Sequence, residues 1–254
     1  MQDRLIGKVI VVAGAGGIGD ELARRYASEG ASVVLGDIDG ERAKAVAVEI
    51  AATGAAVVGT YLDGGDEQSI KAIVDLAVAT YGGLDGFHAN YAGFNAGDSE
   101  HDVTTIPMED FDYVMNVGAR GFMLCTRFAV PAMVARGGGS MVYTSSDAAF
   151  MGETVRVGYA MSKIAAHALM RHVARRFGAQ GIRANVISPG VVAHPRFAEV
   201  MPAEIVEEFT RATLIGRLGR PIDIAAMGAL IMSDEGSYIT GQDISVNGGG
   251  LMRP

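Results

Sequence analysis

A tyrosine and a lysine four positions apart, Tyr159 and Lys163, are the residues of this sequence best placed to do chemistry. On a helix, side chains at this spacing lie on the same face, so the lysine ammonium would act directly on the tyrosine phenol. A free tyrosine keeps its proton until a pH of about 10, and an adjacent cation commonly lowers that pKa by about one to three units. The pair therefore predicts a group that can move a proton near neutral pH. Because the same spacing is common on solvated helix faces, the interpretation depends on the rest of the chain.

A glycine-rich turn near the start of the chain supplies the first part of that context. Residues 8–13 are apolar without alternation, which is typical of a buried parallel strand, and an amphipathic helix follows the turn. In the G-x-G-x-x-G between them, Gly14 would allow the tight turn, Gly16 would let the backbone approach a pyrophosphate, and Gly19 would let helix and strand pack closely. The free amides of the helix N-terminus would face the phosphates. Glycine-rich turns also serve as plain connectors, but this placement predicts a dinucleotide site.

Acidic residues after the second and third strands bear on which dinucleotide is bound. Asp37 ends the strand 32–36, about where a carboxylate accepts hydrogen bonds from the adenosine ribose hydroxyls. The same carboxylate would repel a 2′-phosphate, which favours NAD over NADP. Alternatively, Asp37 is an ordinary strand-end residue or a helix cap, although Asp39 is the stronger candidate for the cap. Asp63, just past the third strand, would reach the adenine amine or serve as a turn residue.

Alternation of strands and helices along the chain predicts the fold. Seven strands are expected, at 8–13, 32–36, 56–62, 84–89, 140–146, 183–188 and 243–246, with helices between them. This pattern indicates an α/β protein with a three-layer Rossmann fold, a seven-stranded parallel sheet with helices on both faces, as a single domain over 1–254. A long helix from about Glu109 to Ala135 is interrupted by Asn116 and Gly118. The segment 193–216, at the carboxyl edge of the sheet, is the expected substrate lid.

The amino-acid composition indicates which kinds of molecule this protein is expected to bind. The net charge of −8 argues against nucleic acid, because phosphate contacts need clustered lysine and arginine. No uninterrupted apolar run reaches the ~20 residues of a membrane span, so we expect neither a membrane nor a nucleic acid as partner, but a small molecule. The single cysteine, Cys125, excludes an internal disulfide, and the absence of a leader-like start favours a reducing, cytoplasmic setting. His167 and His172 are five positions apart and share no helix face, so we expect no metal site.

Taken together and in order, these motifs resemble the short-chain dehydrogenase/reductase family over essentially the whole chain. The resemblance depends on the glycine loop, Asn116, the set of Ser146, Tyr159 and Lys163, the pair Pro189-Gly190, and the ending 237–242 with 247–249. It implies that Tyr159 is the acid/base, and that Lys163 lowers the pKa of this tyrosine while it holds the nicotinamide ribose. Ser146, chosen over Ser145 for its spacing to Tyr159, would polarise the substrate oxygen. Asn116 would hold a water in a proton relay towards Lys163.

The expected cofactor is NAD, and its contacts would come from the turns that follow the strands. The residues expected at the cofactor are Gly14, Gly16, Ile18, Gly19, Asp37, Ile38, Leu62, Asp63, Asn90, Ala92, Gly93, Tyr159, Lys163, Pro189, Gly190 and Val192. By the same resemblance the protein would be a homotetramer that associates through the helices over 109–135 and 159–178.

Three positions depart from the family pattern. The glycine loop is one residue shorter than usual, with two residues between Gly14 and Gly17, so its phosphate contacts are expected but not their detailed geometry. Tyr91 replaces the second asparagine of the usual Asn-Asn-Ala-Gly, where a main-chain group contacts the ribose. His194 stands where a threonine usually touches the carboxamide; it would either contact the ligands or cap a turn.

The expected activity is the NAD(H)-dependent interconversion of a secondary alcohol and a ketone. Oxidation of a cyclic dihydrodiol, or another transformation at the same site, is an alternative enzymatic function. A nicotinamide-binding sensor without turnover is the non-enzymatic alternative. Arg156 and Arg196 leave a carboxylate-bearing substrate open. Apolar residues near the lid suggest an apolar pocket, although a lid can also bury such residues against itself: Met151, Val155, Phe197, Met201 and Leu214.

Overall fold

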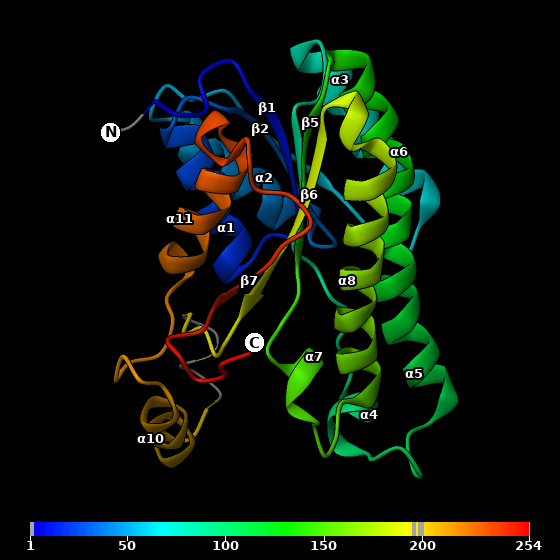
Figure 1. Cartoon of the computed structure of the whole chain (residues 1–254), viewed down its shortest axis with the longest axis vertical. Helices are drawn as coiled ribbons and strands as arrows, with labels where there is room; N and C mark the ends of the chain where they lie inside the picture. The colour runs from blue at the N-terminus through cyan, green and yellow to red at the C-terminus, as the bar shows by residue number, and fades with distance from the viewer. Residues whose placement is uncertain (1–2, 195–196, 198–200, 254) are drawn as a thin grey trace.

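The computed structural model describes residues 3–194, 197 and 201–253, and its centre is a parallel β-sheet (Figure 1). Seven strands pair in the order β3-β2-β1-β4-β5-β6-β7, which confirms the predicted sheet. Their runs of valine and isoleucine suit strands that are buried on both faces. The strands are β1 (Val9–Ala13), β2 (Ser32–Asp37), β3 (Val57–Tyr61), β4 (Gly86–Ala89), β5 (Gly139–Thr144), β6 (Ile182–Pro189) and β7 (Asp243–Val246).

Helices cover both faces of the sheet, so the predicted three layers are confirmed (Figure 1). One face carries α1 (Gly17–Ser28), α2 (Gly40–Ala51) and α11 (Pro221–Met232). The other carries α3 (Glu67–Tyr81), α6 (Gly121–Arg136) and α8 (Val157–Phe177). Two short 3₁₀ turns follow helices on opposite faces of the sheet: Gly178–Gln180 follows α8, and Asp234–Gly236 follows α11.

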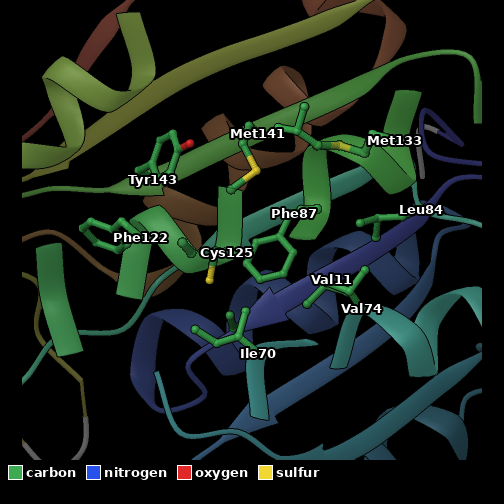
Figure 2. Close-up of a cluster of buried hydrophobic side chains, with 14 of the residues drawn as sticks. Val11, Ile70, Val74, Leu84, Phe87, Phe122, Cys125, Met133, Met141 and Tyr143 are labelled. Carbon is green, nitrogen blue, oxygen red and sulfur yellow. The ribbon is translucent and has the colours of Figure 1, made fainter. Parts of the chain in front are cut away.

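The core under α3, α6 and α8 combines aliphatic side chains with aromatic and sulfur-containing ones (Figure 2). Phe122 meets the ring of Tyr143 edge-on, with centroids 5.7 Å apart. The Tyr143 hydroxyl is paired with the Thr126 hydroxyl at 2.6 Å, so this buried phenol has a polar partner. Burying each such large apolar side chain stabilises the fold by about 1.5–3 kcal/mol. The strands β4 and β5 are therefore held by close packing against α3, α6 and α8.

The predicted long helix is broken where the sequence indicated. It consists of α5 (Met108–Met115), a π-helical turn over Asn116–Arg120, and then α6. At this turn Gly118 lies against α8, where an added Cβ would be 2.5 Å from the Cβ of Ser162. Among the described residues, Met108–Arg136 is the one helix long and apolar enough to cross a membrane, yet half of its most apolar window is buried. Packing on α3 and α8 accounts for that apolar character.

Short helices gather at one end of the sheet, next to the carboxyl ends of the strands (Figure 1). These are α4 (Ala96–Glu100), α7 (Ala148–Met151) and α10 (Ala203–Ala212). The last of them lies within the segment predicted as a lid, of which residues 195–196 and 198–200, including Arg196, lie outside the described residues. The carboxyl edge is the usual ligand-binding edge of an open parallel sheet.

Candidate active site

The first turns of α8 and the end of β5 bring three of the predicted catalytic side chains together. The Ser146 hydroxyl lies beside the Tyr159 phenol and acts to lower its pKa. The Nζ of Lys163 lies 5.6 Å from the centroid of the Tyr159 ring. All three residues line one pocket of about 290 Å³, together with the predicted cofactor residues Asn90 and Pro189. The pocket thus offers a phenol, a hydroxyl and an ammonium to one ligand.

The two adjacent serines have different environments. Ser145 is buried, and its hydroxyl contacts Nε2 of His167 at 2.8 Å and donates to the carbonyl oxygen of Lys163 at 3.1 Å. Ser146 accepts a hydrogen bond from the amide of Ala148 at 3.2 Å and is the serine beside the phenol. The structure therefore places Ser146, the serine predicted from the spacing, where a substrate oxygen at Tyr159 would be within reach.

Burial controls the protonation of the tyrosine and the lysine. It raises the pKa of Tyr159 above the ordinary value, against the opposite effects of the Ser146 hydroxyl and the nearby Arg156 charge. It also lowers the pKa of Lys163 to about 7. The lysine donates to two backbone carbonyls, at 2.8 Å to Thr144 and 3.1 Å to Tyr91. Burial outweighs the effects of Ser146 and Arg156 on Tyr159, and the expected effect of Lys163 on the Tyr159 pKa stays a prediction.

Asn116 begins the π-helical turn between α5 and α6. Its side chain is exposed, and its Oδ1 accepts a hydrogen bond from Arg120 at 3.2 Å while its Nδ2 is directed to the carbonyl of Gly65. The residue of the π-helical turn that faces α8 is Gly118, which packs on Ser162, the neighbour of Lys163. The turn therefore directs this side chain to the β3–α3 connection, and the expected part of Asn116 in a water relay towards Lys163 stays a prediction.

The glycine loop lines a second, larger pocket of about 960 Å³. Gly19 is packed so closely that an added Cβ would lie 1.9 Å from the carbonyl oxygen of Gly14, the residue that follows β1, in line with the close packing of helix and strand predicted for this glycine. A Cβ on Gly16, whose φ is 93°, would meet no protein atom within 4 Å. Its amide donates to Asp20 at 2.9 Å. Backbone amides and open space at a helix N-terminus are what a dinucleotide pyrophosphate requires.

Asp37 and Asp63 line the larger pocket. The carboxylate of Asp37 accepts hydrogen bonds from the amides of Ala15 at 2.8 Å and Asp39 at 2.9 Å, so it joins the glycine loop to the end of β2. Asp39 caps α2 by accepting from the amide of Arg42, as predicted. Asp63 accepts from the amide of Gly65, which makes it a turn residue that also lines the pocket.

Most of the residues expected at the cofactor line one of the two pockets. Gly19 and Gly93 do not: the first packs inside the loop, and an added Cβ on the second would lie 2.9 Å from the Cα of Val114. The others are Gly14, Gly16, Ile18, Asp37, Ile38, Leu62, Asp63, Asn90, Ala92, Tyr159, Lys163, Pro189, Gly190 and Val192. This set, with amides at the glycine loop and a carboxylate at the ribose end, fits a dinucleotide.

Two of the departures from the family pattern receive a structural explanation. The hydroxyl of Tyr91 contacts the Cys125 sulfur at 2.9 Å, so this ring fills the interior while its carbonyl holds Lys163. His194 lies against Gly17 and lines both pockets. Its Nδ1 also accepts a hydrogen bond from the amide of Phe197 at 3.3 Å. The histidine therefore combines the two alternatives, a turn cap and a place beside the ligands.

Sequence reasoning missed three residues around Tyr159. The carboxylate of Asp98, in α4, accepts from the amides of Gly158 and Tyr159. The ring of Phe94 stacks on that of Tyr159, with centroids 5.3 Å apart. Arg156 lies 5.7 Å from the same ring. The sequence indicated Arg156 only as a residue that could bind a substrate carboxylate. Asp98 and Phe94 follow β4 in a segment whose path the sequence does not predict.

The apolar residues expected in the substrate pocket lie elsewhere among the described residues. The two pockets are not lined by Met151, Val155, Phe197, Met201 or Leu214, and Phe94 is the large apolar side chain next to Tyr159. Within the described ranges, no group of three or more histidine, cysteine, aspartate or glutamate side chains is arranged to hold a metal ion.

Comparison with known proteins relates the whole chain to one family. A family model described as enoyl-(acyl carrier protein) reductase matches residues 12–250. A 2,5-dichloro-2,5-cyclohexadiene-1,4-diol dehydrogenase of Sphingobium indicum is 35% identical over 98% of both chains. A (+)-cis,trans-nepetalactol synthase of Nepeta racemosa is 38% identical over 98% of this chain and 96% of its own.

A solved structure extends the likeness to three dimensions. It is a 7α-hydroxysteroid dehydrogenase complexed with NADH and 7-oxo glycochenodeoxycholic acid; it has a TM-score of 0.91 and is 33% identical, over 99% of this chain and 97% of its own. This chain belongs to the short-chain dehydrogenase/reductase family, and it is an oxidoreductase of that type.

Proposed function

We propose that this protein uses NAD(H) to interconvert a cyclic secondary alcohol and the corresponding ketone, with Tyr159 as the acid/base. The observation that carries the proposal is that Ser146, Tyr159 and Lys163 line one pocket. Two relatives are named for cyclic alcohols, a steroid and a cyclohexadienediol. The stacked ring of Phe94 offers an apolar surface to a substrate of that shape.

The residues divide the work as follows. Ser146 and Tyr159 bind the substrate oxygen, and in the oxidation direction Tyr159 takes the hydroxyl proton. The nicotinamide, when bound, accepts or gives the hydride. The Asp37 carboxylate accepts hydrogen bonds at the ribose end and disfavours a 2′-phosphate, which supports NAD. Lys163 is held by the carbonyls of Thr144 and Tyr91 at the position where it would contact the nicotinamide ribose.

The test is turnover of NAD by the purified protein, measured as NADH absorbance. The substrates are a hydroxysteroid, a cyclic dihydrodiol and a linear secondary alcohol, and an enoyl thioester with NADH is added because of the family model's description. We expect oxidation of at least one cyclic alcohol and a loss of about 100-fold or more in Tyr159→Phe. The matched control is Tyr81→Phe, at the end of α3 and away from the pocket. An unchanged rate in Tyr159→Phe would reject the assignment.

A second candidate function is a transformation of a cyclic substrate without net redox change. The name of the Nepeta racemosa relative favours keeping it. Product analysis separates the two: a changed carbon skeleton with constant NADH absorbance supports this candidate. Tight NADH binding without any product would instead support a nicotinamide-binding sensor.

The proposed assembly is a cytoplasmic homotetramer. Its support is the exposure of large apolar side chains on the two helices expected at the interface, namely Tyr113 and Met123 on α5 and α6, and Met161 and Ile164 on α8. Exposed apolar patches of this kind mark association sites. Light scattering on the purified protein measures the mass, and a monomer of 26.4 kDa would reject the tetramer.

A further inference from the structure

Arg156 precedes α8 in a backbone conformation that is unusual for arginine. Its φ is 60° and its ψ 38°, and among the residues that the structure describes it alone, apart from glycines, has a positive φ. A side chain with a Cβ adopts this left-handed region at an energetic cost. The Arg156 amide donates to the carbonyl of Asp98 at 2.7 Å, which helps to hold the turn. The fold therefore maintains an arginine where glycine would be the easier residue.

This turn brings the Arg156 guanidinium to the Tyr159 ring. The Cζ atom lies 5.7 Å from the ring centroid, within the ~6 Å range of cation–π contacts. On its other side, Nη2 of the guanidinium donates to the Glu153 carboxylate at 2.7 Å. Glu153 thus fixes the direction of the guanidinium, and the phenol has a positive charge close to it.

The charge of Arg156 differs from that of Lys163, the other cation near the ring. Lys163 is buried and has a pKa of about 7, so its charge changes near neutral pH. A guanidinium keeps its charge throughout the range in which proteins are folded. Arg156 lowers the pKa of Tyr159, and the Glu153 carboxylate raises it.

Other ionisable groups also lie around this phenol. The carboxylate of Asp98 contacts the Tyr159 amide from α4, and His194 lines the same pocket from beyond β6. These two groups and Lys163 stay in place when Arg156 or Glu153 is changed. The effect of the Arg156–Glu153 pair can therefore be measured against a constant background.

We propose that Arg156 is a positioning residue whose cation, directed by the left-handed turn and by Glu153, sets the acidity of the Tyr159 phenol and hence the pH range of the reaction. This consequence rests on the proposed function, in which Tyr159 takes the substrate proton. The acidity of the phenol itself can be measured without turnover.

The experiment replaces all tyrosines with difluorotyrosine, which ionises at lower pH, and follows residue 159 by ¹⁹F NMR. Its resonance is assigned as the one missing in Tyr159→Phe. We expect Arg156→Gln to raise the ionisation midpoint by about half to one pH unit, a modest shift because the guanidinium is 38% exposed. Glu153→Gln should lower the midpoint, and Arg156→Lys should stay near the native value. Arg175→Gln, on the exposed last turn of α8, is the control and should not shift it.

Arg156→Gly separates the charge from the shape of the turn. Glycine adopts the left-handed conformation without a side-chain clash. If Arg156 acts through its charge, the glycine variant raises the midpoint as Arg156→Gln does, although the turn is kept. The proposal is overturned if the native protein, Arg156→Gln and Arg156→Gly have equal midpoints. It is also overturned if Glu153→Gln raises the midpoint. If no alcohol is oxidised the proposed function fails, and the midpoints still decide this inference.

Discussion

The carboxylate of Asp98 accepts a hydrogen bond at 3.0 Å from the amide of Tyr159, 61 positions further along the chain. Its other oxygen accepts from the amide of Gly158 at 2.8 Å. The residue before α8 makes no side-chain cap, so a residue of α4 satisfies the free amides of the first turn. The buried carboxylate also places a negative charge at the positive end of the α8 dipole. The backbone that carries the phenol is therefore fixed from a different part of the chain.

Asp98→Ala should lower both the stability and the turnover number. Loss of the two hydrogen bonds should reduce the free energy of unfolding by about 1–3 kcal/mol, and a frayed first turn should misplace Tyr159. Asp98→Asn keeps one acceptor and should fall between the two proteins. Asp102→Ala is the control, since the exposed Asp102 bonds only within its own loop. Urea titration and NADH turnover measure both effects, and equal behaviour of the two alanine variants would contradict the capping role.

The π-helical turn predicts opposite outcomes for two nearby substitutions. Asn116→Ala removes an exposed side chain and should change kcat by less than about twofold. Gly118→Ala introduces a Cβ 2.5 Å from that of Ser162, so α8 must move, and both the melting temperature and kcat should fall. Steady-state kinetics with thermal melts check the pair. A severe kcat loss in Asn116→Ala alone would support the relay expected from the sequence.

Asp37→Ser should change the choice of cofactor. Removal of the carboxylate removes the repulsion of a 2′-phosphate, so the ratio of kcat/KM for NADP to that for NAD should rise by about tenfold or more. Part of the gain in kcat/KM for NADP will be offset, because the Ala15 amide loses its carboxylate partner. Asp39→Ser is the control, since it removes a neighbouring carboxylate of the same pocket and leaves Asp37 in place. If the ratio is the same in both variants, the carboxylate of Asp37 does not select the cofactor.

Lys163 should make stability depend on pH. Its pKa falls from 10.5 to about 7 on folding, so between these values the unfolded chain binds more protons than the folded protein. The contribution to stability is complete above pH 10.5 and is lost as the pH falls towards 7. Relative to Lys163→Met, the native protein should therefore gain up to about 1.4 kcal/mol per pH unit on going from pH 7 to 10. Urea titrations across this range measure the difference, and parallel curves would contradict the burial effect.

The fold and much of the site could be predicted because their signals are local. Apolar runs ending in glycine, aspartate or serine define buried parallel strands and their carboxyl ends, and the spacing from Tyr159 to Lys163 defines one helix face. Of the two adjacent serines, Ser146 lines the pocket beside Tyr159 while the Ser145 hydroxyl is bonded to the Lys163 carbonyl, so the choice of Ser146 stays a prediction with support from its position.

The rest depends on contacts between distant parts of the chain. Asp98 reaches the start of α8 only because α4 folds back over it, and no spacing in the sequence indicates this. The sequence also does not show that a π-helical turn at Asn116 places Gly118 against α8 and directs the Asn116 side chain to the β3–α3 connection. The sequence gives the charges around Tyr159, but the balance between charge and burial that raises the Tyr159 pKa is set by packing.

The ring of Tyr91 also constrains how this sequence can change over evolutionary time. An added Cβ on Gly64 would lie 2.7 Å from that ring, and one on Gly121 would lie 3.0 Å from it. While a tyrosine stands at 91, both positions must therefore stay without side chains. A lineage that exchanges Tyr91 for a smaller residue releases Gly64 alone, because an added Cβ on Gly121 would still lie 2.4 Å from the carbonyl oxygen of Gly64, and we expect positions 64 and 91 to vary as a linked pair among the descendants of this gene.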